Sequence, residues 1–294
     1  STPLNAADFT ITQLKQAYQS GDLTPADALK SIAEAIDSKD GDIGGYLSYD
    51  LDLALADAEK VDLSLPLGGV PVAIKDLINA EGQPCGCASK MLTGKYRAPY
   101  DATVVRKLRG AGAIPFGRTN MDEFAMGSSN ETSIYGPAIN PWQLSNKTPL
   151  TPGGSSGGSA AAISANLCLG TLGTDTGGSI RQPAAFNGVV GIKPTYGRCS
   201  RWGIIAFASS LDQAGPITKT VRDSAILLEI ISGHDRRDST SARREVPNFE
   251  KMLNGDIRGK RIGIPIEYRI EGTPNEIIKL WEDCIDQLKS AGAE

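Results

Sequence analysis

The sequence contains few of the residues that build several common kinds of site. Among 294 residues there is one histidine, His234, so a histidine-rich metal centre is excluded and any serine–histidine–acid triad would depend on that residue. The five cysteines lack the spacing of zinc sites. Cys85 and Cys87 form a C-x-C pair, for which a metal or redox role stays open beside the default of reduced thiols in a cytoplasmic protein.

Two further absences concern charge and long apolar runs. The 30 Lys and Arg residues are outnumbered by 34 Asp and Glu, a net charge of −4, so the chain lacks the basic excess with which a protein binds nucleic acid unaided. No apolar run approaches the roughly 18 residues of a membrane-spanning helix. We therefore expect a globular, cytoplasmic protein without a membrane span, and its 40% of hydrophobic residues can build a substantial core.

Helical and strand patterns alternate along the chain. The N-terminal region 1–64 is predicted to be helical, with one helix beginning at Pro25 behind the N-cap Thr24. Strands are predicted over 70–74, 114–117, 169–174, 189–192 and 261–265, and helices over 10–19, 51–61, 102–108, 160–165, near Pro183, over 221–231 behind the N-cap Thr220, and over 273–288. Such alternation predicts an α/β fold with a mixed, largely parallel central sheet covered by helices on both faces.

The C-terminal residues have the pattern of a unit that continues. The helix over 104–113 closes with Leu-Arg-Gly-Ala-Gly-Ala and passes directly into a strand, and residues 285–294 close with the similar Leu-Lys-Ser-Ala-Gly-Ala-Glu. The strand that this pattern predicts does not follow. We expect residues 1–294 to form one incomplete domain, a helical region at 1–64 and an α/β core at 65–294, from the N-terminal part of a longer polypeptide.

Glycine is abundant, with 33 residues, and is densest in two glycine–serine clusters at 153–159 and 176–179. A Gly-Gly-Ser-Ser-Gly-Gly run taken alone fits a flexible linker as well as a functional loop. A helix follows it and apolar strands flank it, which weakens the linker interpretation. The patterns of phosphate-binding loops, G-x-x-x-x-G-K-[ST] and G-x-G-x-x-G, are not found there.

The second cluster has the composition of a site for acyl chemistry. Glycine lets a backbone approach a reacting group closely, and the N–H groups of such a turn can stabilise developing negative charge. Thr176, Gly177 and Gly178 precede Ser179 at a predicted strand-to-helix turn. The pattern predicts an oxyanion hole formed by Thr176, Gly177 and Gly178, with Ser179 as the adjoining nucleophile.

A serine nucleophile needs a base, and the sequence offers two candidates. His234 lies in a charged stretch after a helix, which favours a solvated loop residue. Lys75 ends an apolar strand, where burial would lower its pKa toward that of a usable base, although a salt-bridged structural lysine has the same pattern. Ser155 strengthens the case for Lys75, because a second serine could relay a proton between Lys75 and Ser179.

Taken together, these stretches resemble a known signature. The residues Gly153–Ser159 and Gly173–Ala184, with Val72–Asp76 upstream, are similar to the motifs of the amidase signature family, and the 24-residue step from Ser155 to Ser179 fits them. The resemblance implies the amidase signature fold and a Ser-Ser-Lys triad without a metal. On this chain, Ser179 would be the acyl-forming nucleophile, Ser155 the bridging serine in a cis peptide bond, and Lys75 the terminal base.

Three other stretches, 120–129, 193–198 and 206–213, resemble a subgroup of that family, the A subunits of the glutamyl-tRNA(Gln)/aspartyl-tRNA(Asn) amidotransferases. This resemblance implies a glutaminase that releases ammonia through an acyl-enzyme, in a cytoplasmic hetero-oligomer with B and C subunits. It implies no cofactor in this chain, since ATP, Mg²⁺ and most tRNA contacts would belong to the partner. Met126 and Ser128 are candidate lining residues of the glutamine pocket, but packing and capping at a helix end explain them equally well.

Two other functions stay open. A stand-alone amidase of the same family would use the same triad on another carboxamide and would work without partner chains. A non-catalytic, truncated chain would keep the motifs but bind no substrate. The subgroup's contacts to the α-amino and α-carboxylate groups of glutamine are expected beyond residue 294.

Overall fold

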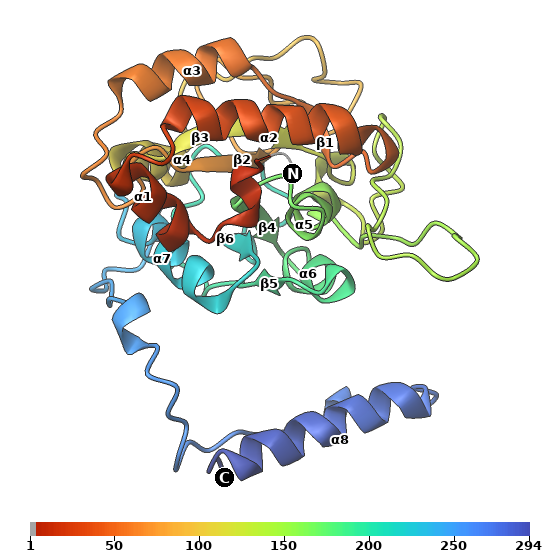
Figure 1. Ribbon diagram of the computed structural model, residues 1–294. Coiled ribbons are helices and arrows are strands. Elements are labelled where there is room, and N and C mark those ends of the chain that lie inside the picture. Colours follow the sequence, from red (N-terminus) through yellow and green to blue (C-terminus); the bar gives the residue numbers. More distant parts are fainter. Residues whose placement is uncertain (1–3) are drawn as a thin grey trace. The chain divides into compact units, whose positions relative to one another are not determined.

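The computed structural model describes residues 4–294, which divide into two compact units (Figure 1). The first unit ends at Glu250 and the second spans Lys251–Glu294. The first unit therefore holds both the helical N-terminal region and most of the predicted α/β core. Within residues 4–294, no helix is both long and apolar enough to cross a membrane.

The elements follow one another in an alternating order. The strands are β1 (Tyr46–Ser48), β2 (Pro71–Lys75), β3 (Ile114–Thr119), β4 (Gly170–Asp175), β5 (Val190–Gly191) and β6 (Gln213–Thr218). The α-helices are α1 (Ile11–Ser20), α2 (Pro25–Lys39), α3 (Leu51–Lys60), α4 (Thr103–Gly110), α5 (Gly157–Ser164), α6 (Arg181–Asn187), α7 (Val221–Ile231) and α8 (Asn275–Ser290). Short 3-10 turns are η1 (Ala6–Asp8), η2 (Asp40–Asp42), η3 (Glu123–Ala125), η4 (Glu250–Met252) and η5 (Ile266–Tyr268).

The strands form one sheet in the order β1-β3-β2-β4-β6-β5. The central pairs β3–β2 and β2–β4 are parallel, whereas β1 pairs antiparallel with β3, and β6 pairs antiparallel with both β4 and β5. Four of the six strands in the described part of the chain therefore run in the same direction. The predicted mixed, largely parallel sheet is confirmed.

Helices cover both faces of this sheet, as predicted. Thr171 of β4 donates a hydrogen bond to the Ser159 hydroxyl of α5, at 3.1 Å. A Cβ atom on the neighbouring Gly170 would lie 2.8 Å from Leu227 of α7. Because successive strand residues point to opposite faces, α5 and α7 pack on opposite sides of β4. Figure 1 shows α6 beside α5.

Two predicted helix starts, at Pro25 and at Val221, are confirmed in detail. Thr24 accepts a hydrogen bond from the Asp27 amide, and the Asp27 side chain accepts one from the Thr24 amide, which makes a capping box in front of Pro25. Thr220 caps α7 through the Asp223 amide. These starts depend on residues adjacent in sequence, so a local pattern is sufficient to predict them.

The predicted strand over 261–265 is wrong. Residues 261–265 form no strand. Two backbone hydrogen bonds join this segment to Glu294: the Ile262 amide donates to the Glu294 carbonyl, and the Glu294 amide donates to the Lys260 carbonyl. A strand needs a partner for its backbone groups, and the second unit contains no other strand. Two strands that the sequence pattern did not predict, β1 and β6, lie in the first unit.

Candidate active site

Lys75 lies at the carboxyl end of β2, in the middle of the sheet, and its side chain is fully buried. Its ammonium nitrogen donates to the Ser155 hydroxyl at 2.7 Å and to the Thr174 hydroxyl at 2.8 Å. β2 and β4 are parallel neighbours, so their carboxyl ends meet at one edge of the sheet. This alignment brings Lys75 to Thr174 and to the glycine-rich turn that follows β4.

Burial lowers the pKa of Lys75 to about 7, because the charged ammonium loses its hydration inside the protein. The carboxylates of Asp122 and Asp175 act in the opposite direction, since a nearby negative charge favours the protonated form. A lysine with this pKa is partly neutral near pH 7. It can therefore accept a proton from the hydroxyl it contacts, which is the property that the sequence predicted for a base here.

The turn that carries Ser155 leads directly into α5. The Gly154–Ser155 peptide bond is cis. The next residue ties this turn to the second cluster, because the Ser156 amide donates to the Ser179 carbonyl at 3.1 Å and the Ser156 hydroxyl donates to the Thr174 carbonyl at 3.1 Å. Both serine-bearing turns and Lys75 therefore lie together, although residues 75 and 179 are far apart in the sequence.

Gly154 is a glycine because a carboxylate lies against its backbone. A Cβ atom at Gly154 would be 2.0 Å from the Asp122 carboxylate, which no side chain could accommodate without movement. Asp122 is buried and is held there by the Asn130 amide at 2.9 Å and the Thr132 hydroxyl at 3.0 Å. The close approach fixes the turn just before Ser155.

Asp175 fixes the turn that carries Ser179. Its carboxylate accepts from the Gly178 amide at 2.8 Å, from the Ile180 amide at 3.1 Å and from the Arg181 guanidinium at 3.0 Å. Burial alone would raise the pKa of Asp175, but these hydrogen bonds hold it below its usual range. Asp175 is therefore ionised and holds the turn that carries Ser179 in place.

The hydrogen bonds to Asp175 determine which amides of the predicted oxyanion hole are free to bind a substrate. The Gly178 amide already donates to Asp175, so it points to that carboxylate rather than to a substrate. In the part of the chain that the structure describes, the amides of Thr176, Gly177 and Ser179 have no hydrogen-bond acceptor. Thr176 contributes its hydroxyl to Asp212, with which it makes a short hydrogen bond.

Ser179 opens onto a pocket of about 230 Å³. Ser128 and Gln182 line it with the glycines of both clusters, and Ala125 and Phe207 form its apolar wall. Met126 is not among the lining residues and its side chain is 56% exposed. Of the two candidate substrate contacts, the structure therefore brings Ser128 and not Met126 to the pocket.

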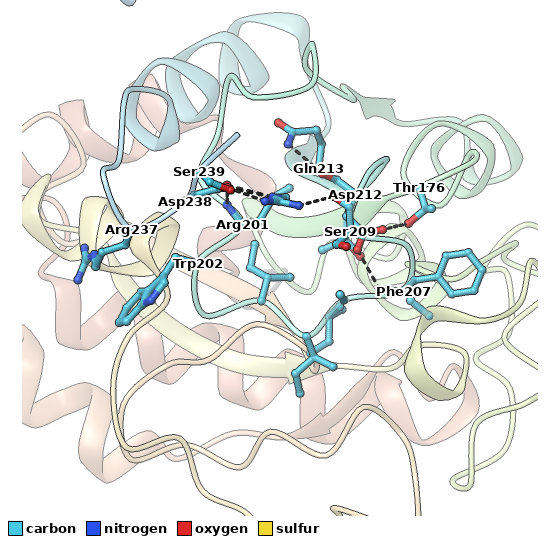
Figure 2. Close-up of a pocket in the computed structure, with 17 residues that line it drawn as sticks. Thr176, Arg201, Trp202, Phe207, Ser209, Asp212, Gln213, Arg237, Asp238 and Ser239 are labelled. Carbon is cyan, nitrogen blue, oxygen red and sulfur yellow. Dashed lines mark hydrogen bonds and ion pairs between the residues drawn. The ribbon is translucent and has the colours of Figure 1, made fainter. Parts of the chain in front are cut away.

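A second pocket of about 250 Å³ adjoins the first, since both are lined by Ala125, Thr176 and Phe207 (Figure 2). Arg201 and Asp238 stand in its wall and face each other. Asp212 holds the wall at the shared edge, where it accepts from the Thr176 hydroxyl and from the Phe207 amide.

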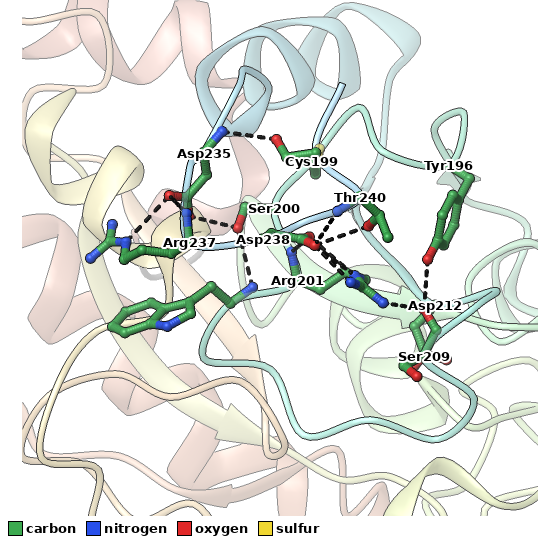
Figure 3. A network of polar contacts seen from close by, with 12 residues as sticks. Tyr196, Cys199, Ser200, Arg201, Ser209, Asp212, Asp235, Arg237, Asp238 and Thr240 are labelled. Carbon is green, nitrogen blue, oxygen red and sulfur yellow. Dashed lines mark hydrogen bonds and ion pairs between the residues drawn. The ribbon is translucent and has the colours of Figure 1, made fainter. Parts of the chain in front are cut away.

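Two charged residues of this wall, Arg201 and Asp238, form an ion pair, and a third, Arg237, pairs with Asp235 behind the wall (Figure 3). Asp238 accepts from the Arg201 guanidinium at 2.7 Å and from the Thr240 hydroxyl at 2.9 Å. Burial would raise the pKa of Asp238, but these bonds hold it well below its usual range. Asp235 is satisfied in the same way by Ser200 at 2.7 Å and by Arg237. The network stiffens the loops around the second pocket.

Among residues 4–294, His234, Cys85 and Cys87 make no hydrogen bond to Lys75, Ser155 or Ser179, although Cys87 is near enough to Lys75 to influence its pKa. His234 is exposed in the loop after α7, with Nδ1 3.2 Å from the Ser241 carbonyl, so the interpretation as a solvated loop residue is confirmed. Cys85 and Cys87 are buried free thiols. Over residues 4–294, no group of three or more His, Cys, Asp or Glu side chains is arranged to hold a metal ion.

Several residues of the site escaped the sequence analysis. Thr174 contacts Lys75, Gln182 lines the pocket, and Asp212 holds the Thr176 hydroxyl. Thr174 and Gln182 belong to the very stretch that carries the resemblance, so their position in the motif was an available signal. Asp212 lies in the stretch 206–213, which carries the resemblance to the subgroup, but it is 36 residues from Thr176 and no local pattern predicts the contact between the two.

The structure thus places together the three residues that the resemblance implies for the site: Lys75, buried and of lowered pKa, Ser155 bonded to it, and Ser179 on the neighbouring glycine-rich turn. The family comparison agrees: the model of the family described as Amidase matches residues 27–294. The chain belongs to the amidase family, as the motifs predicted.

Individual relatives narrow the comparison. The chain is 56% identical over 297 residues to the A subunit of the glutamyl-tRNA(Gln) amidotransferase of Jannaschia sp. (strain CCS1), covering 99% of this chain and 59% of that protein. Among solved structures, it is similar to the A subunit of the same enzyme from Thermotoga maritima, with a TM-score of 0.87, 41% identity, and coverage of 99% of this chain and 61% of that one.

A peptide amidase from Stenotrophomonas maltophilia is nearly as similar in structure, with a TM-score of 0.86, 34% identity, and coverage of 99% of this chain and 62% of that one. The chain thus spans about three fifths of the length of these relatives.

Proposed function

We propose that this chain carries the glutaminase site of a tRNA-dependent amidotransferase. The observation that supports the proposal most directly is the 2.7 Å contact between the buried Lys75 ammonium nitrogen and the Ser155 hydroxyl, beside the turn of Ser179. The similarity to amidotransferase A subunits over 99% of this chain supports glutamine as the carboxamide substrate.

In this mechanism, neutral Lys75 takes a proton from Ser155 while Ser155 takes one from Ser179. The Ser179 oxygen attacks the side-chain amide carbon of glutamine, and the amides of Thr176, Gly177 and Ser179 stabilise the negative charge on the carbonyl oxygen. The carbon–nitrogen bond breaks as the relay returns a proton to the leaving nitrogen, which departs as ammonia. Water then hydrolyses the γ-glutamyl ester of Ser179, and glutamate leaves.

The proposal extends to partners and place of action. In the role of such an A subunit, the chain would work in the cytoplasm within a hetero-oligomer with B and C subunits. It would need no cofactor of its own, because ATP and Mg²⁺ would act on the tRNA-bound glutamate or aspartate in the partner. The net charge of −4 is compatible with tRNA contacts that lie mainly on that partner.

A second candidate is a stand-alone amidase. It is favoured by the TM-score of 0.86 to a peptide amidase, which is close to the 0.87 found for the amidotransferase chain. The two candidates share Lys75, Ser155 and Ser179 and differ in their dependence on partner chains.

The decisive experiment is to trap the acyl-enzyme. The 294-residue chain, alone and with co-expressed B and C subunits, is incubated with glutamine, quenched in acid and analysed by mass spectrometry. We expect a γ-glutamyl ester on Ser179, absent in Ser179→Ala and retained in the control Ser20→Ala on the surface of α1. Ammonia released at the same rate by Ser179→Ala would refute the proposal, and hydrolysis of other carboxamides without partners would favour the second candidate.

A further inference from the structure

Gln182 stands one helical turn from the nucleophile loop. It is the second residue of α6, its amide donates to the Gly178 carbonyl at 2.8 Å, and its side chain lines the pocket onto which Ser179 opens. The mechanism above does not use it. Its polar side chain nevertheless lies between the turn that carries Ser155 and the turn that carries Ser179, whose relative positions matter for the mechanism.

The carboxamide of Gln182 makes two hydrogen bonds of opposite polarity. Its oxygen accepts from the Gly154 amide at 3.0 Å, immediately before Ser155, and its nitrogen donates to the Ser128 carbonyl at 2.9 Å. Gly154 and Ser128 lie in separate chain segments that both line the pocket. One side chain therefore connects the turn of the bridging serine, the segment of Ser128 and the helix that begins after Ser179.

The contact with the Ser155 turn is close. A Cβ atom at Gly153 would lie 2.4 Å from the Gln182 side-chain oxygen and 2.9 Å from the Pro183 Cα. The glycine, whose φ is +76°, lets the backbone lie directly against the amide, and the space between them does not admit a larger group. The turn that carries Ser155 is thus both packed against the Gln182 side chain and hydrogen-bonded to it.

We propose that Gln182 is a positioning residue that sets the width of the substrate pocket and the placement of Ser155 relative to Ser179. This inference rests on the proposed function, because it assigns Gln182 a role in acylation of Ser179. The chemistry at the position is demanding, since one end must accept from an N–H and the other must donate to a carbonyl. Glutamine does both, an ionised glutamate can only accept, and methionine does neither.

The test compares Gln182→Glu, Gln182→Met and the control Gln16→Glu, which makes the same change on the exposed surface of α1. The rate of γ-glutamyl ester formation on Ser179 is measured in a single turnover, at several glutamine concentrations, with the B and C subunits present. We expect both Gln182 variants to form the ester at least about tenfold more slowly than the parent chain at pH 8, and Gln16→Glu to match the parent. Hydrogen exchange of α5 and β4 reports whether each variant stays folded.

The pH dependence separates this role from a merely structural one. A protonated glutamate can donate to the Ser128 carbonyl while its other oxygen accepts from Gly154, as the amide does. We therefore expect the rate of Gln182→Glu, divided by that of the parent chain at the same pH, to rise at least about threefold from pH 8 to pH 5.5. For Gln182→Met this ratio stays constant.

Three results would overturn the inference or its premise. Variants that match the parent chain in rate, or a Gln182→Glu ratio that does not change with pH, would remove the positioning role while leaving the acyl-enzyme intact. The absence of any ester on Ser179 in the parent chain would instead refute the proposed function. The two failures are thus distinguishable.

Discussion

The two compact units of this chain contrast sharply in burial. Residues 4–250 contain the buried core and every residue of the candidate site, whereas residues 251–294 contain no buried residue at all. Yet α8 in the second unit is a regular helix with apolar side chains such as Leu280 and Trp281, both exposed. Local sequence is sufficient to form a helix, but burial, and with it a lowered lysine pKa, requires surrounding elements.

The contrast is tested most strongly at Lys75. We expect Lys75→Met to slow acylation of Ser179 by about 100- to 10,000-fold, because the base is lost while a buried side chain of similar length remains. Single-turnover ester formation with glutamine measures the effect. The exposed Lys30→Met in α2 is the matched control and should react at the parent rate.

The same experiment has a defined pH dependence. The pKa of Lys75 is lowered to about 7, so the lysine is protonated and inactive as a base below that pH and neutral above it. The parent rate should therefore rise as pH increases through about 7 and then level off, whereas the residual rate of Lys75→Met should show no such step. A step retained in Lys75→Met would assign the titration to another group.

The next smaller effect is expected on stability. Ile74 in the core and Ile266 on the surface form a matched pair for this test, and Ile74 is taken first. Ile74 of β2 is fully buried, and Ile74→Ala should lower the free energy of unfolding of the first unit by about 2–5 kcal/mol, through lost apolar burial and the cavity left behind. Hydrogen exchange of the β2, β3 and β4 amides in increasing urea measures it. A loss below about 1 kcal/mol would show that the sheet is not the stable centre of this unit.

Local features of the fold could be predicted, and features that depend on distant partners could not. Thr24 and Thr220 cap their helices through amides three residues away, so the sequence alone locates those starts. The strand β6 carries Pro216, which lacks an amide donor and argues against a strand, but pairing with both β4 and β5 overrides it. The strand expected over 261–265 failed for the converse reason, because no neighbouring strand supports it.

The site shows the same division. Lys75, Ser155 and Ser179 could be proposed because each residue type and its flanking pattern already suggest acyl chemistry. The lowered pKa of Lys75, by contrast, depends on complete burial among β2, β4 and α5, which the apolar strand could suggest but not measure. The Asp175 brace on the Gly178 amide depends on atomic geometry, and it changes which amides of the turn can face a substrate.

The smallest effect is expected for the second isoleucine of the pair. Ile266, in η5 of the second unit, is 83% exposed, so Ile266→Ala removes little buried area and should change the stability of the first unit by no more than about 0.5 kcal/mol. The same hydrogen-exchange measurement on the β2, β3 and β4 amides decides this, with Ile74→Ala as the positive control. If Ile266→Ala lowers their protection by tenfold or more, the two units are energetically coupled and the contrast between them must be abandoned. If protection is unchanged, the stability that keeps Lys75 buried comes from the first unit alone. The same isoleucine-to-alanine change would then lower stability only where neighbouring elements surround the side chain.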